Sequence, residues 1–353
     1  MVTLKRKRTW LRLGLSTLIV LFVPYAMLTF PFNRSSIETI RVNLNSVFHG
    51  MERKNTQDTK QILEAEKKWI DEFMSTHREI NRLRRELILQ KCAKYPELNG
   101  STPISDNTFH HIYVSDKYKL LYCFIPKVGC SNWKRVMMIL NGSNKSMSEM
   151  DSGEVHEHNN MTRLGSFPPD ARQHRLNTYT TFMYVRNPFV RVLSAYNNKF
   201  ANIAQYRSSK YFQDMARRIM KKMRPKATIR EQRTGENITW IEFVDYLTQP
   251  TRPFFDDHWE EMFKICSPCK IKYDYIGHLE TIAQDAKFMI KDLQLDSLVE
   301  YPSKENSHPT NSSTLFEQGF LNLPKQTIQK LWKIYKKDFE IFDYPKPDFI
   351  TDF

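Results

Sequence analysis

The fold is decided by residues 118–140, which read YKLLYCFIPKVGCSNWKRVMMIL. Tyr118 to Ile125 is a short apolar and aromatic run of the kind that forms a strand buried in a sheet. Pro126 ends this run, and Pro126 to Ser131 predicts a turn. Asn132 to Leu140 then has its apolar residues at positions suited to a helix that packs on the sheet. The stretch predicts a strand, a tight turn and a helix.

Two further stretches repeat this order. Thr181 to Val185 predicts a strand, and a turn of Arg186, Asn187 and Pro188 leads into a helix from Phe189 to Phe200. Tyr273 to Glu280, followed by Thr281 to Leu293, has the same pattern. Strands that alternate with helices predict an α/β domain with a mostly parallel central sheet flanked by helices.

Composition sets the class of protein and of partner. The chain has 353 residues, of which 41% are hydrophobic, so it can bury a large core and is not wholly disordered. Lys and Arg number 53 against 39 Asp and Glu, which gives a net charge of +14. Such an excess favours polyanionic partners: nucleic acid, anionic lipid, nucleotide phosphates or acidic glycans.

The N-terminus predicts the compartment. Lys5 to Arg8 are basic and precede Leu13 to Phe30, a run without a charged residue. As a helix this run would span about 27 Å, close to the roughly 30 Å of a bilayer core. The basic residues keep the short N-terminus cytosolic. We expect a cytosolic tail at 1–12 and a transmembrane signal anchor at 13–30, with a cleaved signal peptide as the alternative.

Sequons and cysteines agree with a lumenal position for the rest of the chain. Five cysteines in an oxidising lumen predict one or two disulfides and one remaining thiol. Cys266 and Cys269 could instead form half of a zinc site, but no second pair completes it. A lumenal domain rarely meets nucleic acid, so no nucleic acid partner is expected. Seven asparagines fit the N-glycosylation pattern: Asn33, Asn99, Asn141, Asn144, Asn160, Asn237 and Asn311.

Residues 31–108 are polar and charged, which predicts a partly helical stem before a lumenal domain at 109–353. Within the stem, apolar residues occupy the a and d positions of one heptad frame: Ile62, Trp69, Phe73, Ile80, Leu83 and Leu87. This stripe could pack on the chain's own globular domain or form a coiled-coil homodimer, and the sequence does not decide between them.

Both predicted turns have the features of anion sites. A strand that leads through a tight loop into a helix N-terminus presents free N–H groups to an anion. The first loop adds Lys127, Gly129, Ser131 and Asn132, although it lacks the Walker A spacing for a nucleoside triphosphate. In the second, Arg186 and Ser194 can converge on one phosphate. Two such sites on neighbouring strands predict a ligand with two separated phosphates.

These residues resemble a known family. The stretches IPKVGCSNWKRVMMIL and YVRNPFVRVLSAYNNKF resemble the 5′-phosphosulfate and 3′-phosphate motifs of Golgi carbohydrate sulfotransferases, the family that contains chondroitin, dermatan and N-acetylgalactosamine 4-O-sulfotransferases. The resemblance runs from about residue 109 to 345 and includes EVH at Glu154, RLNTY at Arg175, HW at His258, CSPC at Cys266 and YDYIGHLET at Tyr273. Several motifs in the same order make it specific.

The resemblance implies a P-loop-like sulfotransferase fold, 3′-phosphoadenosine 5′-phosphosulfate (PAPS) as donor, no metal, and a single-pass type II Golgi membrane protein. By this match the 5′-phosphosulfate would lie against Pro126, Lys127, Val128, Gly129, Cys130, Ser131 and Asn132. The 3′-phosphate would lie against Arg186, Asn187, Pro188, Phe189, Val190, Arg191, Val192, Leu193 and Ser194. The family usually has an acidic residue where this chain has Asn187, which removes a charge that could orient Arg186.

Sulfuryl transfer needs cations around the transferring oxygens and a base for the hydroxyl proton. Lys127 is the candidate cation, and His156 and His258 are the candidate bases because both lie in family-like motifs. Arg207 to Arg230 holds nine basic residues and one acidic residue, and could attract an acidic glycan or be a solvated helix face.

We therefore expect a PAPS-dependent carbohydrate sulfotransferase that acts on position 4 of N-acetylgalactosamine in chondroitin, dermatan or N-glycan-type acceptors. A sister specificity, such as 3-O-sulfation of terminal glucuronate, is one alternative. A non-catalytic lumenal glycan-binding protein is the other, since Asn187 and the basic segment are compatible with it.

Overall fold

The computed structural model describes residues 34–251, 255–302 and 319–350. By its internal contacts the chain divides into two units, residues 1–72 and residues 73–353. Helix α2 (Arg34–Ala93) supplies the described part of the first unit and continues into the second. No helix in these described ranges is both long and apolar enough to cross a bilayer, and the predicted anchor at 13–30 lies outside them.

The second unit is built on one four-stranded sheet with the order β1-β2-β3-β4. Its strands are β1 (Ile112–Ser115), β2 (Leu120–Cys123), β3 (Thr180–Val185) and β4 (Tyr275–His278). The last three, which form the parallel part, are the strands that the sequence predicts, and the prediction of a mostly parallel sheet is confirmed. The edge strand β1 was not predicted; it pairs antiparallel with β2.

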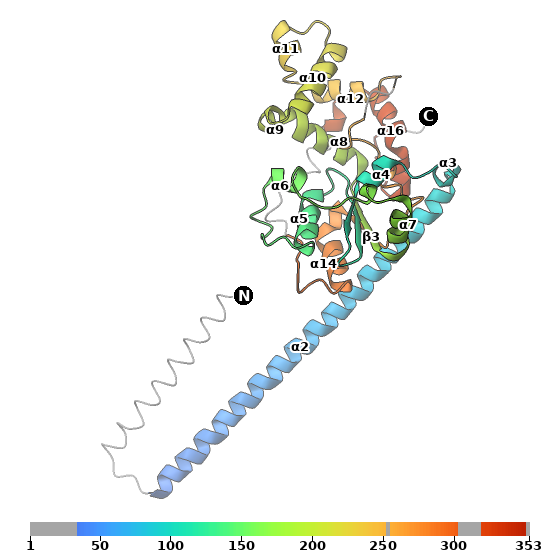
Figure 1. The fold of residues 1–353 in the computed structure, drawn as a ribbon. Helices are drawn as coiled ribbons and strands as arrows, with labels where there is room; N and C mark the ends of the chain where they lie inside the picture. The colour runs from blue at the N-terminus through green and yellow to red at the C-terminus, as the bar shows by residue number, and fades with distance from the viewer. Residues whose placement is uncertain (1–33, 252–254, 303–318, 351–353) are drawn as a thin grey trace. The chain divides into compact units, whose positions relative to one another are not determined.

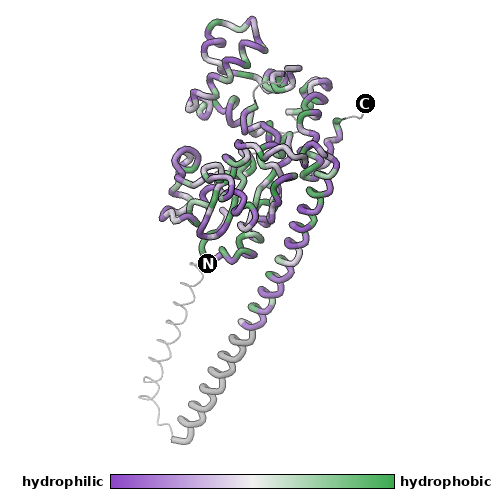
Figure 2. Tube along the Cα trace, turned by 45° about the vertical axis from the view of Figure 1, so that its right-hand side comes forward, coloured by the Kyte–Doolittle hydropathy of each residue, from purple (hydrophilic) through white to green (hydrophobic). Residues whose placement is uncertain are grey.

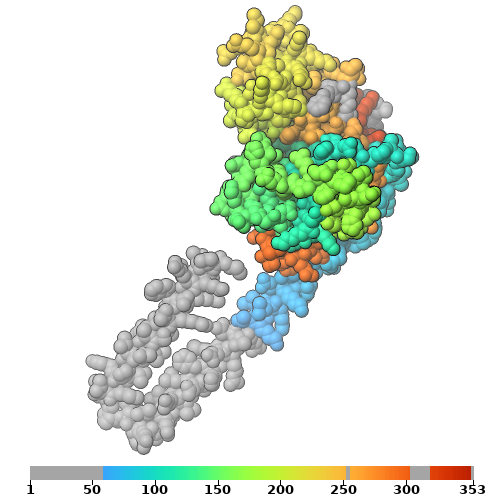
Figure 3. All heavy atoms as spheres, viewed as in Figure 1, coloured from blue at the N-terminus to red at the C-terminus, as the bar shows by residue number. Residues whose placement is uncertain are grey.

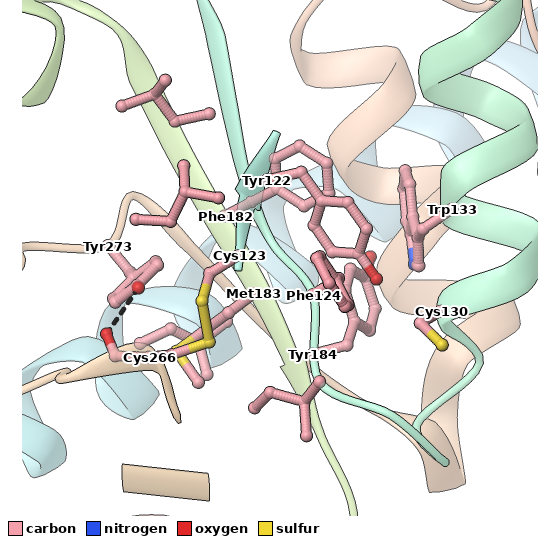
Figure 4. Close-up of a cluster of buried hydrophobic side chains, with 14 of the residues drawn as sticks. Tyr122, Cys123, Phe124, Cys130, Trp133, Phe182, Met183, Tyr184, Cys266 and Tyr273 are labelled. Atoms are coloured by element: carbon pink, nitrogen blue, oxygen red, sulfur yellow. Dashed lines mark hydrogen bonds between the residues drawn. A yellow bond between two sulfur atoms is a disulfide. The ribbon is translucent and has the colours of Figure 1, made fainter. Parts of the chain in front are cut away.

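Alternate residues of the strands face opposite sides of the sheet. Tyr122 and Phe182 are partners in register and stack with ring centroids 4.7 Å apart, on the side where Trp133 of α5 packs. The next partners, Cys123 and Met183, face the other side. Figure 4 shows both groups, with Trp133 at one side of the strands and Cys123 at the other. Side chains on both faces are buried because helices cover the sheet on both sides.

Helices and turns surround the sheet in chain order. They are α3 (Pro96–Asn99), α4 (Asp106–His110), α5 (Cys130–Leu140), α6 (Ser152–His156), η1 (Leu164–Ser166), α7 (Pro169–Thr178), α8 (Pro188–Tyr196), η2 (Asn197–Ala201), α9 (Ile203–Arg207), α10 (Lys210–Met223), α11 (Ile229–Thr234), α12 (Trp240–Leu247), α13 (Met262–Cys266), η3 (Leu279–Thr281), α14 (Ile282–Asp292) and α16 (Lys325–Ile341). The helices α5, α8 and α14 follow β2, β3 and β4, as the sequence predicts.

A second hydrophobic core lies beside the sheet core. Its largest buried side chains include Phe189 from α8, Phe243 from α12 and Phe339 from α16. Trp259 joins it from the segment that precedes α13. In Figure 2 much of the hydrophobic trace, in green, lies in the interior of the globular part. The two hydrophobic cores thereby hold the loops after β2 and β3, and also the segment around Trp259.

Two disulfides confirm the prediction from the cysteine count. Cys92 pairs with Cys269, and Cys123 pairs with Cys266, which leaves Cys130 as a buried free thiol. Since Cys266 and Cys269 bond to other cysteines, neither is a zinc ligand. Among the residues that the structure describes, no group of three or more His, Cys, Asp or Glu side chains is placed to hold a metal ion.

The C-terminal part of α2 packs on the globular domain. Asn81 Nδ2 donates to the main-chain oxygen of Asp274 at 2.8 Å, and Arg84 pairs with Asp285 at 2.8 Å. This packing supports the first alternative for that part of the stem. Three residues of the heptad stripe are largely exposed: Ile62 at 65%, Trp69 at 53% and Leu83 at 50%. A homodimer through these residues stays a prediction.

Candidate active site

The loop between β2 and α5 has an unusual backbone. Gly129 has a φ of 83°, and a Cβ at this position would lie 2.8 Å from Cδ1 of Ile282, so a larger residue would strain the backbone and displace this side chain. Lys127 has a φ of 71°, a conformation that a non-glycine residue adopts mainly where the surrounding structure enforces it. No side chain caps the N-terminus of α5. Its first N–H groups are therefore available to an anion.

Two buried arginines tie the loops after β2 and β3 together. Arg186 Nη1 donates to the main-chain oxygen of Lys127 at 3.2 Å. Arg191 is fully buried and donates to the main-chain oxygens of Pro126, Asp257 and Glu260 at 2.9, 2.6 and 2.6 Å. All three donor groups of Arg191 are thus used within the protein. The structure gives Arg191 the role of holding the first loop against the segment that contains His258.

Asn187 caps α8. Its side-chain oxygen accepts hydrogen bonds from the N–H groups of Phe189 and Val190 at 3.1 and 3.2 Å. Its own N–H donates to Oε1 of Glu280, whose other oxygen accepts from the hydroxyl of Tyr344, both at 2.9 Å. The charge of Glu280 also opposes the lowering of the Arg186 pKa by burial. The charge of Glu280, which follows the end of β4, therefore acts on Arg186. From the sequence alone, Asn187 in place of the usual acidic residue suggested that Arg186 had lost such a charge.

The other predicted donor residues fall into two groups. Half-buried side chains at the helix starts are Ser131, Asn132, Val190 and Ser194. Side chains buried in the protein are Pro126, Val128, Cys130, Pro188, Phe189, Val192 and Leu193. The buried group shapes the two loops from inside. Only main-chain atoms and the half-buried group remain for direct contact with a ligand.

His156 ends α6 beside the first loop. Its Nε2 lies 2.9 Å from Oγ of Ser131, and its Nδ1 lies 3.3 Å from Nζ of Lys134. Because an ammonium only donates, Nδ1 accepts, and Nε2 carries the proton and donates to Ser131. Burial of the ring, and then the charge of Lys134, lower the pKa of His156 to about 3. His156 is partly exposed, but burial and the charge of Lys134 both favour the uncharged imidazole, so the ring is neutral. Both of its nitrogens are engaged.

His258 has a different arrangement. Its Nδ1 lies 2.6 Å from Oδ1 of Asp256, and this carboxylate oxygen also accepts from the main-chain N–H of His258 at 2.9 Å. Nδ1 therefore carries the proton, and Nε2 carries the lone pair. In the described part of the chain no hydrogen bond engages Nε2, and 26% of the side chain is exposed. Burial lowers the pKa of His258, while Asp256 opposes this shift.

Two lysines bring positive charge to this place. Burial, and then the charge of Lys199, lower the pKa of Lys127 to about 8. The charges of both lysines lower the pKa of His258. Arg191 joins the two segments, because it donates to the main-chain oxygens of Pro126 and Asp257, the residues before Lys127 and His258. Lys199 Nζ lies 4.6 Å from the ring centroid of Phe212, and this ring meets the ring of His258 at 5.4 Å. The structure thus brings Lys127 and His258 together, as expected, and adds Lys199.

The basic segment is divided by the fold. In Figure 3 the helices α10 and α11, in yellow, form one end of the second unit. Arg224 pairs with both Glu231 and Glu242 at 2.8 and 2.6 Å, so this arginine stabilises the lobe. Arg207 and Arg217 also have acidic partners. The exposed cations without an ion pair among the described residues are Lys210, Arg218, Lys221, Lys222, Lys226 and Arg230.

Sequence reasoning missed three polar residues of the site: Lys199, Asp256 and Glu280. Asp256 had a visible signal, because it precedes His258 by two residues in DDHW. Lys199 lies in the π-helical turn η2, a feature that is frequent at functional sites, but nothing in the sequence marks it. Glu280 comes from a third strand-helix unit, so only the sheet order places it beside Arg186.

Comparison with known proteins agrees with this geometry. Residues 110–345 match the sulfotransferase family. Carbohydrate sulfotransferase 10 of Rattus norvegicus is 37% identical over 279 residues, which cover 76% of this chain and 77% of the relative. Carbohydrate sulfotransferase 8 of Mus musculus is 33% identical over 75% of this chain and 63% of the relative. No solved structure matches. The chain therefore belongs to the carbohydrate sulfotransferase family, enzymes that transfer sulfate to sugars.

Proposed function

We propose that this enzyme transfers a sulfuryl group from PAPS to a hydroxyl of an acidic glycan, with His258 as the base. The observation that carries the proposal is Nε2 of His258, which no hydrogen bond engages among the described residues. Asp256 orients this ring, and the charges of Lys127 and Lys199 act on it. The family implies PAPS, and the uncapped start of α5 with Lys127 and Arg186 suits a ligand with two phosphate-type groups.

In this mechanism the donor supplies an activated sulfuryl group. His258 Nε2 takes the proton of the sugar hydroxyl as the hydroxyl oxygen bonds to sulfur, and Asp256 stabilises the imidazolium that forms. The bond from sulfur to the 5′-phosphate oxygen of the donor breaks, and 3′-phosphoadenosine 5′-phosphate (PAP) leaves. Lys127 and the N–H groups of α5 stabilise negative charge on the transferring and leaving oxygens. His156 holds the hydroxyl of Ser131 through Nε2 and is a positioning residue, because neither nitrogen is open to an acceptor.

For the acceptor, we propose position 4 of N-acetylgalactosamine in chondroitin, dermatan or N-glycan-type chains. Hydroxyl 3 of a terminal glucuronate is the second candidate. The charge of Lys199 beside His258 favours the second candidate, since a glucuronate would bring its own carboxylate to this place. The exposed cations of α10 favour the first, in which the acid belongs to a neighbouring sugar. The two acceptors thus depend on different cations.

The test is transfer from labelled PAPS to desulfated chondroitin, dermatan, a glycan with terminal N-acetylgalactosamine and a glycan with terminal glucuronate. The labelled product is then cleaved to disaccharides to locate the sulfate. Sulfate at position 4 of N-acetylgalactosamine supports the first candidate, and sulfate on glucuronate supports the second. A folded, PAP-binding ectodomain that labels none of the four contradicts the acidic-glycan proposal.

The pH profile of kcat/KM follows from the two shifted groups. Because the pKa of His258 is lowered, its neutral form persists on acidification, and activity should fall only below the usual histidine pKa of about 6.5. Lys127 loses its charge above a pKa of about 8, so activity should fall again there. Lys127→Arg should move the alkaline limb upward, since arginine stays charged. An unmoved alkaline limb in this variant would refute the assignment of that limb to Lys127.

We further propose that residues 13–30 anchor the enzyme in the Golgi membrane as a type II protein. All sequon asparagines among the described residues, Asn99, Asn141, Asn144, Asn160 and Asn237, are exposed, which suits a lumenal domain. The full-length protein should stay with membranes after a carbonate wash and lose mass with endoglycosidase. A soluble, unglycosylated product would contradict the topology.

A further inference from the structure

An exposed aromatic ring lies next to the proposed base. Tyr211, in the first turn of α10, leaves 48% of its surface exposed. Its hydroxyl donates to Oδ2 of Asp256 at 2.9 Å, while the other oxygen of this carboxylate holds Nδ1 of His258 at 2.6 Å. The ring of Phe212 meets Tyr211 at 5.0 Å and His258 at 5.4 Å. Tyr211 is therefore fixed relative to His258 by two independent contacts.

This combination is unusual for a surface tyrosine. A tyrosine whose hydroxyl is anchored and whose ring stays open presents a rigid apolar face at low entropic cost. Pyranose rings have an apolar face of C–H groups that packs against such a surface. The neighbouring Phe212 is buried and closes the gap between the tyrosine and the histidine. A sugar that rests on Tyr211 would lie beside the Asp256–His258 pair.

A cation lies further along the same helix face. Arg218 follows Tyr211 by seven residues, two helical turns, which places it about 10 Å along α10 on the same side. Arg218 is exposed and has no ion pair within the described ranges. Burial and Asp256 raise the pKa of Tyr211, and the positive charge of Arg218 lowers it by a smaller amount. The charge of Arg218 therefore acts on Tyr211.

We propose that Tyr211 is the stacking platform for the acceptor sugar and that Arg218 pairs with an acidic group of the next part of the glycan. This inference rests on the proposed function and narrows it. The sugar that receives the sulfuryl group would not itself carry the acidic group. The acceptor would carry a carboxylate or sulfate about 10 Å further along the glycan. Exposed basic residues on α11, such as Arg230, would not take part directly.

The experiment separates the ring, its hydroxyl and the cation in the full ectodomain. Acceptor KM and kcat are measured with chondroitin and with carboxyl-reduced chondroitin, which lacks the acidic groups. The variants are Tyr211→Ala, Tyr211→Phe and Arg218→Ala. Arg230→Ala is the control for a basic residue of the same segment, and Ile229→Ala, 87% exposed on α11, is the control for an apolar surface residue.

We expect Tyr211→Ala to raise the acceptor KM about 3- to 10-fold with both polymers, since an aromatic contact of this kind contributes about 0.5–1.5 kcal/mol. Tyr211→Phe keeps the ring and should leave KM unchanged, but it should shift the acid limb of the pH profile because Asp256 loses a donor. Arg218→Ala should raise KM about 2- to 5-fold for chondroitin only, and added salt should remove the difference.

Unchanged KM in Tyr211→Ala would overturn the platform, and equal effects of Arg218→Ala and Arg230→Ala would overturn the specific role of Arg218. An effect of Arg218→Ala on the carboxyl-reduced polymer would do the same. Affinity for 3′-phosphoadenosine 5′-phosphate (PAP), measured by calorimetry, shows that each variant is folded. If the wild-type enzyme labels neither these polymers nor any other glycan, the proposed function itself fails. If the wild-type enzyme transfers sulfate and the variants keep its KM, only the roles of Tyr211 and Arg218 fail.

Discussion

His258→Ala is expected to lower kcat by about 10²- to 10⁴-fold, the usual contribution of a general base, while its affinity for PAP stays within about twofold of the wild type. The reason is that Nε2 of His258 acts only when the acceptor loses its proton, whereas the donor contacts come from the loops after β2 and β3. Single-turnover transfer with saturating PAPS measures the chemical step, and calorimetry measures PAP affinity.

Two variants make this prediction specific. Asp256→Asn keeps the shape of the dyad but removes the charge that stabilises the imidazolium, so it should lose a large part of the same activity. His158→Ala is the matched control, because His158 is 78% exposed and has no contact with the site. His156→Ala should have the smaller effect on kcat. If His156→Ala abolishes turnover while His258→Ala does not, the base is His156 and our assignment is wrong.

Lys127→Ala is expected to lower kcat by about 10²- to 10³-fold and PAP affinity by roughly tenfold or more. A cation directed at developing charge contributes about 3–4 kcal/mol in a transition state, and a charge-assisted hydrogen bond contributes about 1.5–3 kcal/mol in the ground state. Lys127 is half-buried, and Arg186 donates to its main-chain oxygen, so the fold holds its main chain in place.

Arg186→Lys tests the second loop without emptying a buried site. Its single ammonium cannot replace the planar guanidinium, so PAP affinity should fall roughly tenfold. Lys333→Ala on α16 is the control, since Lys333 is exposed and no hydrogen bond or ion pair among the described residues joins it to either loop. Unchanged PAP affinity in both Lys127→Ala and Arg186→Lys would remove the donor site from these loops, whatever the result for His258.

Much of the fold follows from local pattern. The runs that became β2 and β3 are mostly apolar because strands buried on both faces exclude most polar residues. The strand β4 is partly exposed at its ends, and it was found because a helix pattern follows it, as one follows β2 and β3. The edge strand β1 was missed because it has only four residues, Ile112–Ser115, and no turn signal separates it from its surroundings. Five cysteines predicted one or two disulfides and a remaining thiol, but only the structure shows that there are two and how they pair.

The candidate site divides in the same way. The sequence by itself determined the two loops, Lys127, Arg186 and the pair of candidate histidines, because these residues lie within short motifs whose chemistry depends on near neighbours. Only the tertiary structure distinguishes the two histidines by their contacts. His156 meets Lys134 and Ser131 with its two nitrogens, whereas His258 has Asp256 on one nitrogen and, within the described ranges, no hydrogen bond on the other.

Lys199, Glu280 and Tyr211 were likewise decided by the fold. Each comes from an element far along the chain from the loop or residue on which it acts. The sequence does not reveal such contacts, because a hydrogen bond or a charge acts over a few ångströms of space and not over a number of residues. The sequence states which side chains are available. Which nitrogen is free, which carboxylate is within reach and which ring stays exposed are set when the strands, helices and two hydrophobic cores pack against one another.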